Sequence, residues 1–593
     1  VFGLGWGGWP VWESLSKKAR EEIVEVMIKE GDHFAKGGIP QTWNYPNSSI
    51  EELGLQGFLF SLLANMMPEH PRHDEWERLS RIWNFSQISC PKELAANPRF
   101  RDGTRLRDYA GYNPQTVWGY IDRNGGSIHD GGTMMNHWIT HHGYASCQLT
   151  RFSSLAVYKL AGREPPEGFD TVGVKRTRDF FTRLVKPWGG HIAPDGWNDP
   201  YGFFIAPYNF LIYQHATPES WAAWQTTFRR VKALHEKHRD KLAFSFDFWN
   251  YSYGRILGPM KEPAEKLTTE QLMTRLSGVH VSPKAKYVLH RSPKSYACFD
   301  WHSMSMNSGL LDMDPVVHDK SGDGATTVHL MNAGGQVKWD RLSVQERSRM
   351  KVESLDARED GFSVVLSNNS VNKLRNMMSY TSLPNCHTVL VSRLVAGDDM
   401  VVKQLQMGRA TFLLDKAGAS ATGKEGAKEK WPWWDDHKLY LPEGRDMKFS
   451  SNEFKPELNP RPVWVNVGNR MGYISIGKSP TIGAGGSAIH FEAFKEDREF
   501  GAGEEIGLVV LVSFAGVTAD ETARLADEVR MLRAAPEGVY AVRIPKVEGL
   551  KGTVWVVTNF RAEPVTLALP FEAGGDGKVT VERKSCVLVN QEQ

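Results

Sequence analysis

Residues Ser49 to Pro68 read SIEELGLQGFLFSLLANMMP. Ser49 and Glu52 have the spacing of a helix capping box, in which two side chains satisfy backbone N–H groups of the first turn. Behind them, apolar side chains recur every three or four positions, which predicts a buried helix that ends at Pro68. This pattern is typical of the first half of the chain and indicates a helical N-terminal domain.

Further helices are expected on the C-terminal side of this one. Thr217 and Pro218 form a favourable helix start, with a capping side chain followed by proline at the first helical position. The other predicted helices cover residues 74–83, 141–160, 174–185, 221–235 and 269–276. Short polar turns separate them, and no repeat of fixed length is visible. We therefore expect an α/α toroid over residues 1–280 rather than a solenoid of identical units.

From about Tyr287 the pattern changes to short β-rich runs such as KYVLH, FSVVLS and HTVLVSRLV. Gly, Asn and Asp separate these runs. We expect a large antiparallel β-sandwich over residues 281–463 and a smaller C-terminal β domain over residues 464–593. One helix is predicted in the C-terminal domain, from Thr518 to Ala534. The predicted fold class is therefore multidomain α+β.

Composition limits the classes of partner. A chain of 593 residues is too long for one core, and a net charge of +2 creates no global field for nucleic acid or membrane. No apolar run reaches the roughly 18 residues of a membrane span. The five cysteines lie far apart without a CxxC pair, which argues against a cysteine-built zinc site. The opening at Val1 lacks a signal-peptide pattern, which is compatible with a removed leader.

The stretch from Asn124 to Tyr144 reads NGGSIHDGGTMMNHWITHHGY and gathers amide, imidazole and phenol side chains among glycines. These groups suit removal of a proton from the carbon beside a carboxylate. Amide and imidazolium donors neutralise the enolate-like charge that builds up, and a phenol or neutral imidazole moves the proton. No metal and no pair of carboxylates is needed. The stretch therefore points to a lyase that acts on an acidic sugar polymer.

Two Asn–His pairs compete for the catalytic role within this stretch. In the first, Asn136 would hold the substrate carboxylate and His137 would be the neutraliser or the base. The structural alternative is that Asn136 caps a helix and His137 is a buried, hydrogen-bonded histidine. Asn124 and His129 form the second pair. The sequence leaves both pairs open.

The proton-transferring tyrosine is expected downstream of the Asp195-Gly196 pair. Tyr208 is our candidate, with Tyr144 and Tyr201 as alternates; the structural alternative is a core stripe of aromatic residues. Substrate contacts are expected from both halves of the chain, namely Asn124, Trp138, Trp197, Tyr201, His290 and Arg291. The alternative for His290 and Arg291 is an ordinary strand charge.

Three segments resemble the heparinase II/III-like and alginate-lyase polysaccharide lyases. They are NGGSIHD or MNHW, then APDGWNDPYGFFIAPYNFLIY (Ala193 to Tyr213), then YVLHRSPKSYACFDWHS with the later HDKSGDGATTVHLM. The resemblance extends over about residues 45–335. The resemblance implies an α/α toroid, here incomplete, packed on an antiparallel sandwich with the cleft between them.

The resemblance also implies β-elimination on a uronic-acid polymer, with Tyr208 on the toroid side and Arg291 or His290 on the sandwich side. Glycosaminoglycan, alginate and glucuronan backbones all remain open. No cofactor is implied, although a structural Ca²⁺ or Zn²⁺ is compatible with the family. The implied location is periplasmic or secreted, in a bacterium. Oligomeric state is left open.

Three alternatives compete with this hypothesis. His137 and His141 have the spacing of a helical zinc pair, but the HEXXH motif is absent. A glycoside hydrolase would need two facing carboxylates, for which the nearby acids are Asp195, Asp199 and Asp247. A non-catalytic glycan-binding protein would use the abundant aromatic side chains to stack on sugars.

Overall fold

The structure of the protein is a computed structural model. It describes residues 2–37, 50–88, 135–136, 139–140, 149–165, 172–192, 194, 216–237, 256, 261–283, 286–301, 305–312, 316–317, 327–331, 337–341, 351–369, 374–412, 438–448, 463–476, 482–485, 488–494, 497–532, 535–571 and 575–590. The chain forms two compact units. The helical unit comprises Val1–Ala193, Asp199–Leu272 and Ser420–Lys424, and the sheet unit comprises Pro194–Asn198, Met273–Ala419 and Glu425–Gln593.

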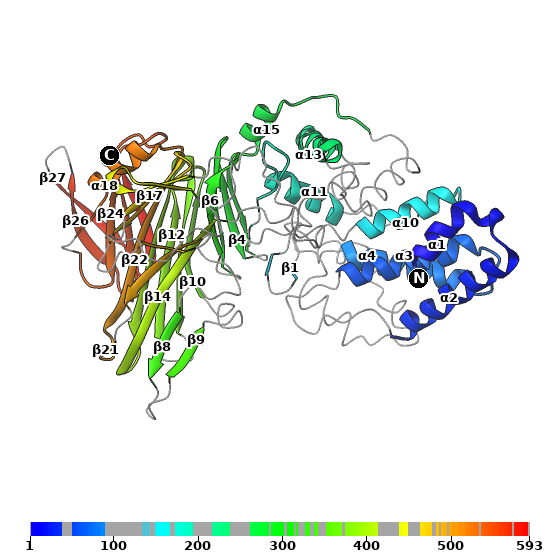
Figure 1. Ribbon diagram of the computed structural model, residues 1–593, viewed down its shortest axis with the longest axis horizontal. Coiled ribbons are helices and arrows are strands. Elements are labelled where there is room, and N and C mark those ends of the chain that lie inside the picture. The colour runs from blue at the N-terminus through cyan, green and yellow to red at the C-terminus, as the bar shows by residue number, and fades with distance from the viewer. Residues whose placement is uncertain are drawn as a thin grey trace. The chain divides into compact units, whose positions relative to one another are not determined.

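The first half of the chain is helical, as the sequence predicts (Figure 1). Its described helices are α1 (Phe2–Gly8), η1 (Trp9–Ser14), α2 (Lys17–Gly37), α3 (Ile50–Met66), α4 (His73–Ile88), α10 (Leu149–Leu160), α11 (Val172–Leu184), α13 (Pro218–Lys237) and α15 (Thr269–Arg275). The predicted helix that ends before Pro68 is α3, and the Thr217-Pro218 start opens α13. Residues 141–148 of another predicted helix lie outside the described residues, and the remainder of that helix is α10.

Helix α3 is buried over residues 57–65, where most of its side chains are apolar. Phe58, Leu62 and Leu63 of α3 pack in one core with Trp76 and Trp83 of α4. A small polar network runs through this core. Its hydrogen bonds are Ser61 Oγ to Ser80 Oγ at 2.6 Å, Asn84 Nδ2 to Ser80 O at 2.8 Å and Ser154 Oγ to Asn84 Oδ1 at 2.9 Å. The network ties α3, α4 and α10 together and satisfies polar groups that would otherwise be costly to bury.

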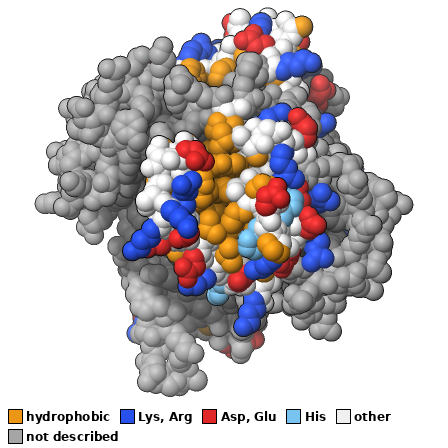
Figure 2. All heavy atoms as spheres, turned by 90° about the vertical axis from the view of Figure 1, so that its right-hand side faces the viewer, with side chains coloured by type: hydrophobic (Ala, Val, Ile, Leu, Met, Phe, Trp, Pro, Cys, Tyr) orange, Lys and Arg blue, Asp and Glu red, His pale blue; other side chains and the backbone are white. Residues whose placement is uncertain are grey.

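The apolar face of the first helices reaches the surface. Figure 2 shows hydrophobic side chains gathered in a band between charged ones. Leu4, Val11 and Val26 are 53%, 48% and 40% exposed. Within the described ranges, no helix is long and apolar enough to cross a membrane.

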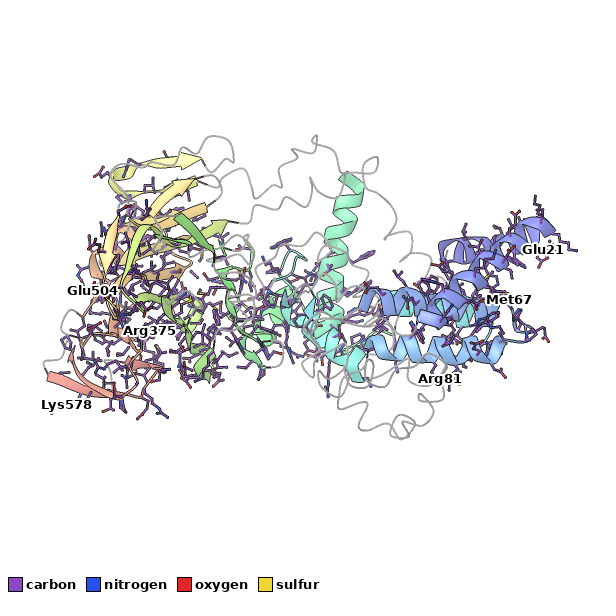
Figure 3. The ribbon with its side chains drawn as sticks, turned by 90° about the horizontal axis from the view of Figure 1, so that it is seen from below. Glu21, Met67, Arg81, Arg375, Glu504 and Lys578 are labelled. Carbon is purple, nitrogen blue, oxygen red and sulfur yellow. The ribbon has the colours of Figure 1, made fainter. Side chains whose placement is uncertain are left out.

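The sheet unit contains two large sheets, and every strand pairing described in it is antiparallel. The nine-stranded sheet has the order β10 (Lys351–Arg358), β11 (Gly361–Asn369), β12 (Leu374–Ser382), β13 (Thr388–Ala396), β22 (Glu505–Ala515), β18 (Met471–Ile476), β17 (Trp464–Val467), β15 (Lys438–Tyr440) and β16 (Asp446–Lys448). Arg375 on β12 and Glu504, just before β22, mark this sheet in Figure 3.

The second large sheet has eleven strands. Its path is β19 (Ile482–Gly485), β20 (Ala488–Phe494), β14 (Met400–Phe412), β7 (Val316–Val317), β6 (Ser305–Leu310), β5 (Ser295–Asp300), β4 (Tyr287–Arg291) and β3 (Gly278–Ser282). Three more strands join it at β14, directly or through β8: β8 (Thr327–Met331), β9 (Val337–Arg341) and β21 (Arg498–Phe500). One core unites the two sheets, with Val288 and Phe299 on one side and Phe362, Tyr380 and Leu511 on the other. The predicted α+β class, helical first and antiparallel β afterwards, is confirmed.

The predicted boundary at residues 463/464 falls inside these sheets. Strands β17, β18 and β22 follow it in sequence, yet β22 pairs with β13 and continues the nine-stranded sheet. The remaining C-terminal elements are α18 (Ala519–Glu528), a four-stranded sheet and a hairpin. The four strands are β23 (Arg530–Met531), β24 (Val539–Ile544), β25 (Val554–Asn559) and β28 (Ser585–Asn590), and the hairpin is β26 (Val565–Phe571) with β27 (Gly575–Val581). The predicted helix Thr518–Ala534 is too long, because β23 begins at Arg530 and pairs with β24.

The C-terminal strands cover the second face of the nine-stranded sheet. Val391 and Val510 of that sheet share a core with Val542 and Val556 of β24 and β25. A polar cluster reinforces the junction. Arg393 Nε donates to Glu505 Oε2 at 3.0 Å, Arg393 Nη2 donates to Glu537 Oε1 at 2.6 Å, and Tyr540 Oη donates to Glu505 Oε2 at 2.6 Å. The cluster connects β13, β22 and β24.

Candidate functional site

Asn136 lies in a short antiparallel hairpin. Strand β1 (Met135–Asn136) pairs with β2 (Ile139–Thr140), with Asn136 opposite Ile139. This geometry excludes two of the alternatives that the sequence left open. Asn136 does not cap a helix, because it is in a strand. The helical zinc pair His137/His141 is also wrong, because Ile139 and Thr140, which lie between the two histidines, are in a strand and not in a helix.

His290 and Arg291 are adjacent in β4, so their side chains point to opposite faces of the sheet. His290 shares its face with Val288, which belongs to the core between the two large sheets. Arg291 shares the other face with Tyr287 and Leu289. We call this second face of β4, β5 and β6 the outer face. It carries Tyr287, Leu289, Arg291, Tyr296, Cys298, Asp300 and Asn307, all of them buried.

The surroundings of His290 are those of a structural histidine. The side chain is 3% exposed, and its Nδ1 lies 2.8 Å from Ser382 Oγ and 3.6 Å from Cys386 Sγ. Burial lowers the pKa of His290 to about 4. The charge of Asp360 opposes this shift slightly, and the charge of Arg358 adds to it. A neutral imidazole that faces the sandwich core does not attract an acidic polymer. The prediction that His290 binds substrate therefore does not fit its position.

The same cluster contains a thiol, but not a reactive one. Burial raises the pKa of Cys386 to about 12, with Ser295 and Ser292 opposing the shift. Because the thiolate is the nucleophilic form of cysteine, Cys386 is inert at neutral pH. Within the described ranges, no group of three His, Cys, Asp or Glu side chains is arranged to hold a metal ion.

Arg291 is 1% exposed and belongs to the outer face. Its Nη2 lies 3.3 Å from the Sδ of Met273, at the end of α15. Asp300 carries a carboxylate at the opposite end of the same face, and Lys286 lies near it. Burial lowers the pKa of Lys286, and the charge of Asp300 opposes that shift. The outer face thus carries a guanidinium at one end and a carboxylate at the other.

The outer face also holds the chain at Pro194, directly before Asp195-Gly196. Asn307 Nδ2 donates to the carbonyl oxygen of Pro194 at 3.0 Å, and Cys298 Sγ lies 3.8 Å from the same oxygen. Cys298 and Asn307 are directly opposite each other on β5 and β6. Pro194, which directly precedes the Asp-Gly pair of the resemblance, is therefore attached to the face that carries Arg291.

Most of the predicted site residues lie outside the described residues. These are Asn124, His129, His137, Trp138, Tyr144, Trp197, Tyr201 and Tyr208, together with the competing acids Asp195, Asp199 and Asp247. Their roles stay predictions.

Sequence reasoning missed Asn307 and Cys298. The partner of both is Pro194, more than one hundred positions earlier in the chain, and no periodicity records such a contact. A weak signal existed in strand alternation. In β5, the alternate residues Tyr296, Cys298 and Asp300 carry polar atoms and lie on the outer face, whereas Ala297 and Phe299 face the core.

Comparisons with known proteins come from solved structures. No family model matches the chain, and no curated protein matches its sequence. Two structures described as heparinase III, one of them the BT4657 gene product, are 10% identical to this chain with TM-scores of 0.43. They cover 90% and 91% of this chain and 69% and 70% of their own. Heparan sulfate lyase HepC from Pedobacter heparinus is 9% identical with a TM-score of 0.35, over 95% of this chain and 69% of its own.

Proposed function

We propose that this protein is a polysaccharide lyase that cleaves a uronic-acid-containing polymer by β-elimination. The proposal rests on the Asn/His/Tyr composition of residues 124–144 and on the attachment of Pro194 to the sheet face that carries Arg291. The attachment of Pro194 is the main support for the proposal. It connects the segment that contains the Asp-Gly pair with the sheet that carries Arg291. Pro194, within the segment Ala193 to Tyr213, lies on the same sheet face as Arg291.

The proposed mechanism starts with binding of the uronate carboxylate by Asn136 and neutralisation of its charge by His137, with Asn124 and His129 as the competing pair. Neutralisation makes the C5 proton more acidic, because the negative charge that builds up on the carboxylate is stabilised. Tyr208 or a neutral histidine takes this proton, and a tyrosine protonates the oxygen that leaves C4. The products are a new reducing end and a C4–C5 double bond.

Arg291 would contribute through its charge. A buried cation acts over a longer distance than an exposed one, because the protein interior and the lack of mobile ions screen it less. A guanidinium beneath the outer face would therefore favour an acidic chain near it. The mechanism requires no cofactor, and a structural Ca²⁺ or Zn²⁺ stays a prediction.

The test is to incubate the protein with heparan sulfate, chondroitin sulfate, hyaluronan, alginate and glucuronan. Ultraviolet absorbance of the conjugated double bond and the appearance of reducing ends are recorded in parallel. We expect both signals to rise together with at least one polymer. Reducing ends without absorbance would mean a hydrolase, and the acids Asp195, Asp199 and Asp247 would then be the first candidates. Binding without either signal would mean a non-catalytic glycan-binding protein.

A further inference from the structure

Pro194 stands at the point where the chain passes from the helical unit into the sheet unit. On the helical side, the residues before it form a tight turn after α11. Ile192 N donates to Leu184 O at 2.7 Å, Lys186 N donates to Gly190 O at 2.7 Å, and Val185 bridges to His191. Ile192 is fully buried. The turn after α11 is therefore well ordered up to Ile192.

On the sheet side, two neighbouring strands hold Pro194 at one atom. Its carbonyl oxygen accepts a hydrogen bond from Asn307 Nδ2 of β6 at 3.0 Å and lies 3.8 Å from Cys298 Sγ of β5. Both side chains have no exposed surface. Asn307 is itself held in place, since Tyr380 Oη donates to its backbone oxygen at 3.3 Å. The carboxamide thus starts from a rigid strand in the interior of the sheet unit.

A hydrogen bond of this kind determines position more than stability. A typical net contribution is about 1 kcal/mol, but a buried donor in a rigid sheet restricts where its partner can lie. The following Asp195-Gly196 pair opens the segment in which our proposed function expects the catalytic tyrosine.

We propose that Asn307, with Cys298 beside it, is a positioning residue that holds Pro194, at the start of the Asp-Gly segment, against the outer face. This inference rests on the proposed function for its catalytic consequence, but the attachment itself can be measured without any substrate. Asn307 acts through the segment and not on the sugar. Its loss should therefore lower kcat, while the affinity for the polymer changes little.

Cys298 provides the readout that does not depend on activity. Its thiol is buried beside the Pro194 carbonyl, so release of the segment should expose it to an alkylating reagent. Cys386 and Cys586 are also free and buried, and neither lies next to Pro194 in the described contacts. They report on global opening of the sheet unit in the same sample. Alkylation by iodoacetamide under native conditions, mapped by mass spectrometry, gives all three rates at once.

The variant is Asn307→Ala, and the matched control is Asn466→Ala. Asn466 of β17 is also fully buried, and its Nδ2 donates to the backbone oxygen of Val517 at 2.9 Å. Both changes therefore remove one buried carboxamide that is bonded to a carbonyl in the sheet unit. Only the first removes the attachment of Pro194.

We expect Asn307→Ala to raise the alkylation rate of Cys298 at least about fivefold over Cys386 and Cys586, since loss of a bond worth about 1 kcal/mol corresponds to a factor of about five. Asn466→Ala should leave the rate of Cys298 at the wild-type value. With an active polymer, kcat of Asn307→Ala should fall about tenfold or more and KM should stay within about twofold.

Three results would overturn the inference. The first is an unchanged rate for Cys298 in Asn307→Ala. The second is equal acceleration of all three cysteines, which would make Asn307 a general stabilising residue. The third is a faster Cys298 with normal kcat, which would show that the attachment does not serve catalysis. If the wild-type protein cleaves no polymer at all, the proposed function fails, while the alkylation rates still decide whether Asn307 holds the segment.

Discussion

Arg291 and His290 are neighbours in β4 whose surroundings give them different chemistry. His290 faces the core and is neutral, whereas Arg291 lies on the outer face with Pro194. We predict that Arg291→Ala raises KM for the cleaved polymer about tenfold, because a weakly screened buried charge worth about 1.4 kcal/mol of attraction for an acidic chain is lost. Arg291→Lys keeps the charge but lacks the planar guanidinium group. Its KM should lie between the KM of the wild type and that of Arg291→Ala.

The control for this prediction is Arg375→Ala, since Arg375 is exposed on β12 of the other large sheet (Figure 3). It removes the same charge without touching the outer face. Steady-state kinetics, with melting temperatures to detect unfolding, make the comparison. If Arg291→Ala and Arg375→Ala have the same KM, Arg291 plays no part in binding the substrate.

The position of a residue could be predicted from the sequence where it depends on local structure, and could not be predicted where it depends on contacts between distant parts of the chain. The opposite facing of His290 and Arg291 follows from strand alternation alone, but β4 is buried on both faces, so no polar side marked the solvent side. The hairpin at Asn136 was missed because His137 and His141 suggested a helical spacing. The attachment of Pro194 to Asn307 depends on tertiary folding, which local patterns do not encode.

Helix α18 begins with a complete capping box. Glu521 N donates to Thr518 Oγ1 at 3.2 Å, and Thr518 N donates to Glu521 Oε2 at 2.7 Å. Thr518→Ala should lower the free energy of unfolding by about 1 kcal/mol, because one N–H of the first turn loses its partner. Chemical denaturation measures the change. Thr518→Ser keeps the hydroxyl and should remain near wild type; an equal loss in both variants would mean that the hydroxyl is not the cause.

The contact between α18 and β18 depends on a glycine. A Cβ at Gly472 would lie 2.4 Å from Thr522 Oγ1 and 3.0 Å from Val517 Cγ2. Thr522 cannot simply rotate away, since its hydroxyl accepts from Asn466 Nδ2 at 2.8 Å. We predict that Gly472→Ala destabilises the protein by about 1–3 kcal/mol. Gly3→Ala in α1, where nothing lies within 4 Å, is the control and should not destabilise; unfolding that is unchanged in Gly472→Ala would contradict the close packing.

Elements with a strong local signal were predicted well. The capping box before α3 and the Thr217-Pro218 start of α13 both mark real helices. The end of α18 was predicted too late, because no glycine or proline follows Glu528 directly. What stops this helix is the pairing of Arg530 and Met531 with β24, a contact that the local sequence does not show.

Acid stability of the whole molecule follows from buried groups with lowered pKa values. His290 has a pKa of about 4 in the folded protein and 6.5 when unperturbed, so the unfolded chain binds more protons between these values. Stability is therefore complete above pH 6.5 and falls by about 3 kcal/mol as the pH drops towards 4. His387, whose pKa burial also lowers, acts in the same direction.

Glu353 adds a second phase at lower pH. Burial would raise its pKa, but hydrogen bonds from Lys584, Ser367 and Lys351 lower it to about 2. The stability that it contributes is present above pH 4.5 and is lost as the pH falls towards 2. Urea denaturation across this range should therefore show two successive losses. Glu353→Gln should reduce only the lower one, and an identical slope below pH 4.5 in both proteins would refute this assignment.

At the level of the whole molecule, the sequence predicted the order of architectures but not the division of the strands. The spacing of apolar residues distinguished the helical half from the β half, because this spacing differs between helices and strands. It placed β17, β18 and β22 in a separate C-terminal domain, whereas pairing of β22 with β13 joins them to the large sheet. Which strands become neighbours depends on long-range pairing, and the hydrophobic pattern of each strand is the same in either arrangement.

The central claim is that bond cleavage is an elimination. The most direct test is whether the products incorporate an oxygen atom from the solvent water. The protein is incubated in ¹⁸O-labelled water with a uronate polymer that it cleaves. The masses of the products are then measured by mass spectrometry. We predict fragments whose non-reducing ends are one water lighter than hydrolysis products and carry no heavy oxygen from the cleavage step. Fragments of full hydrolytic mass with one heavy oxygen per broken bond would contradict the account.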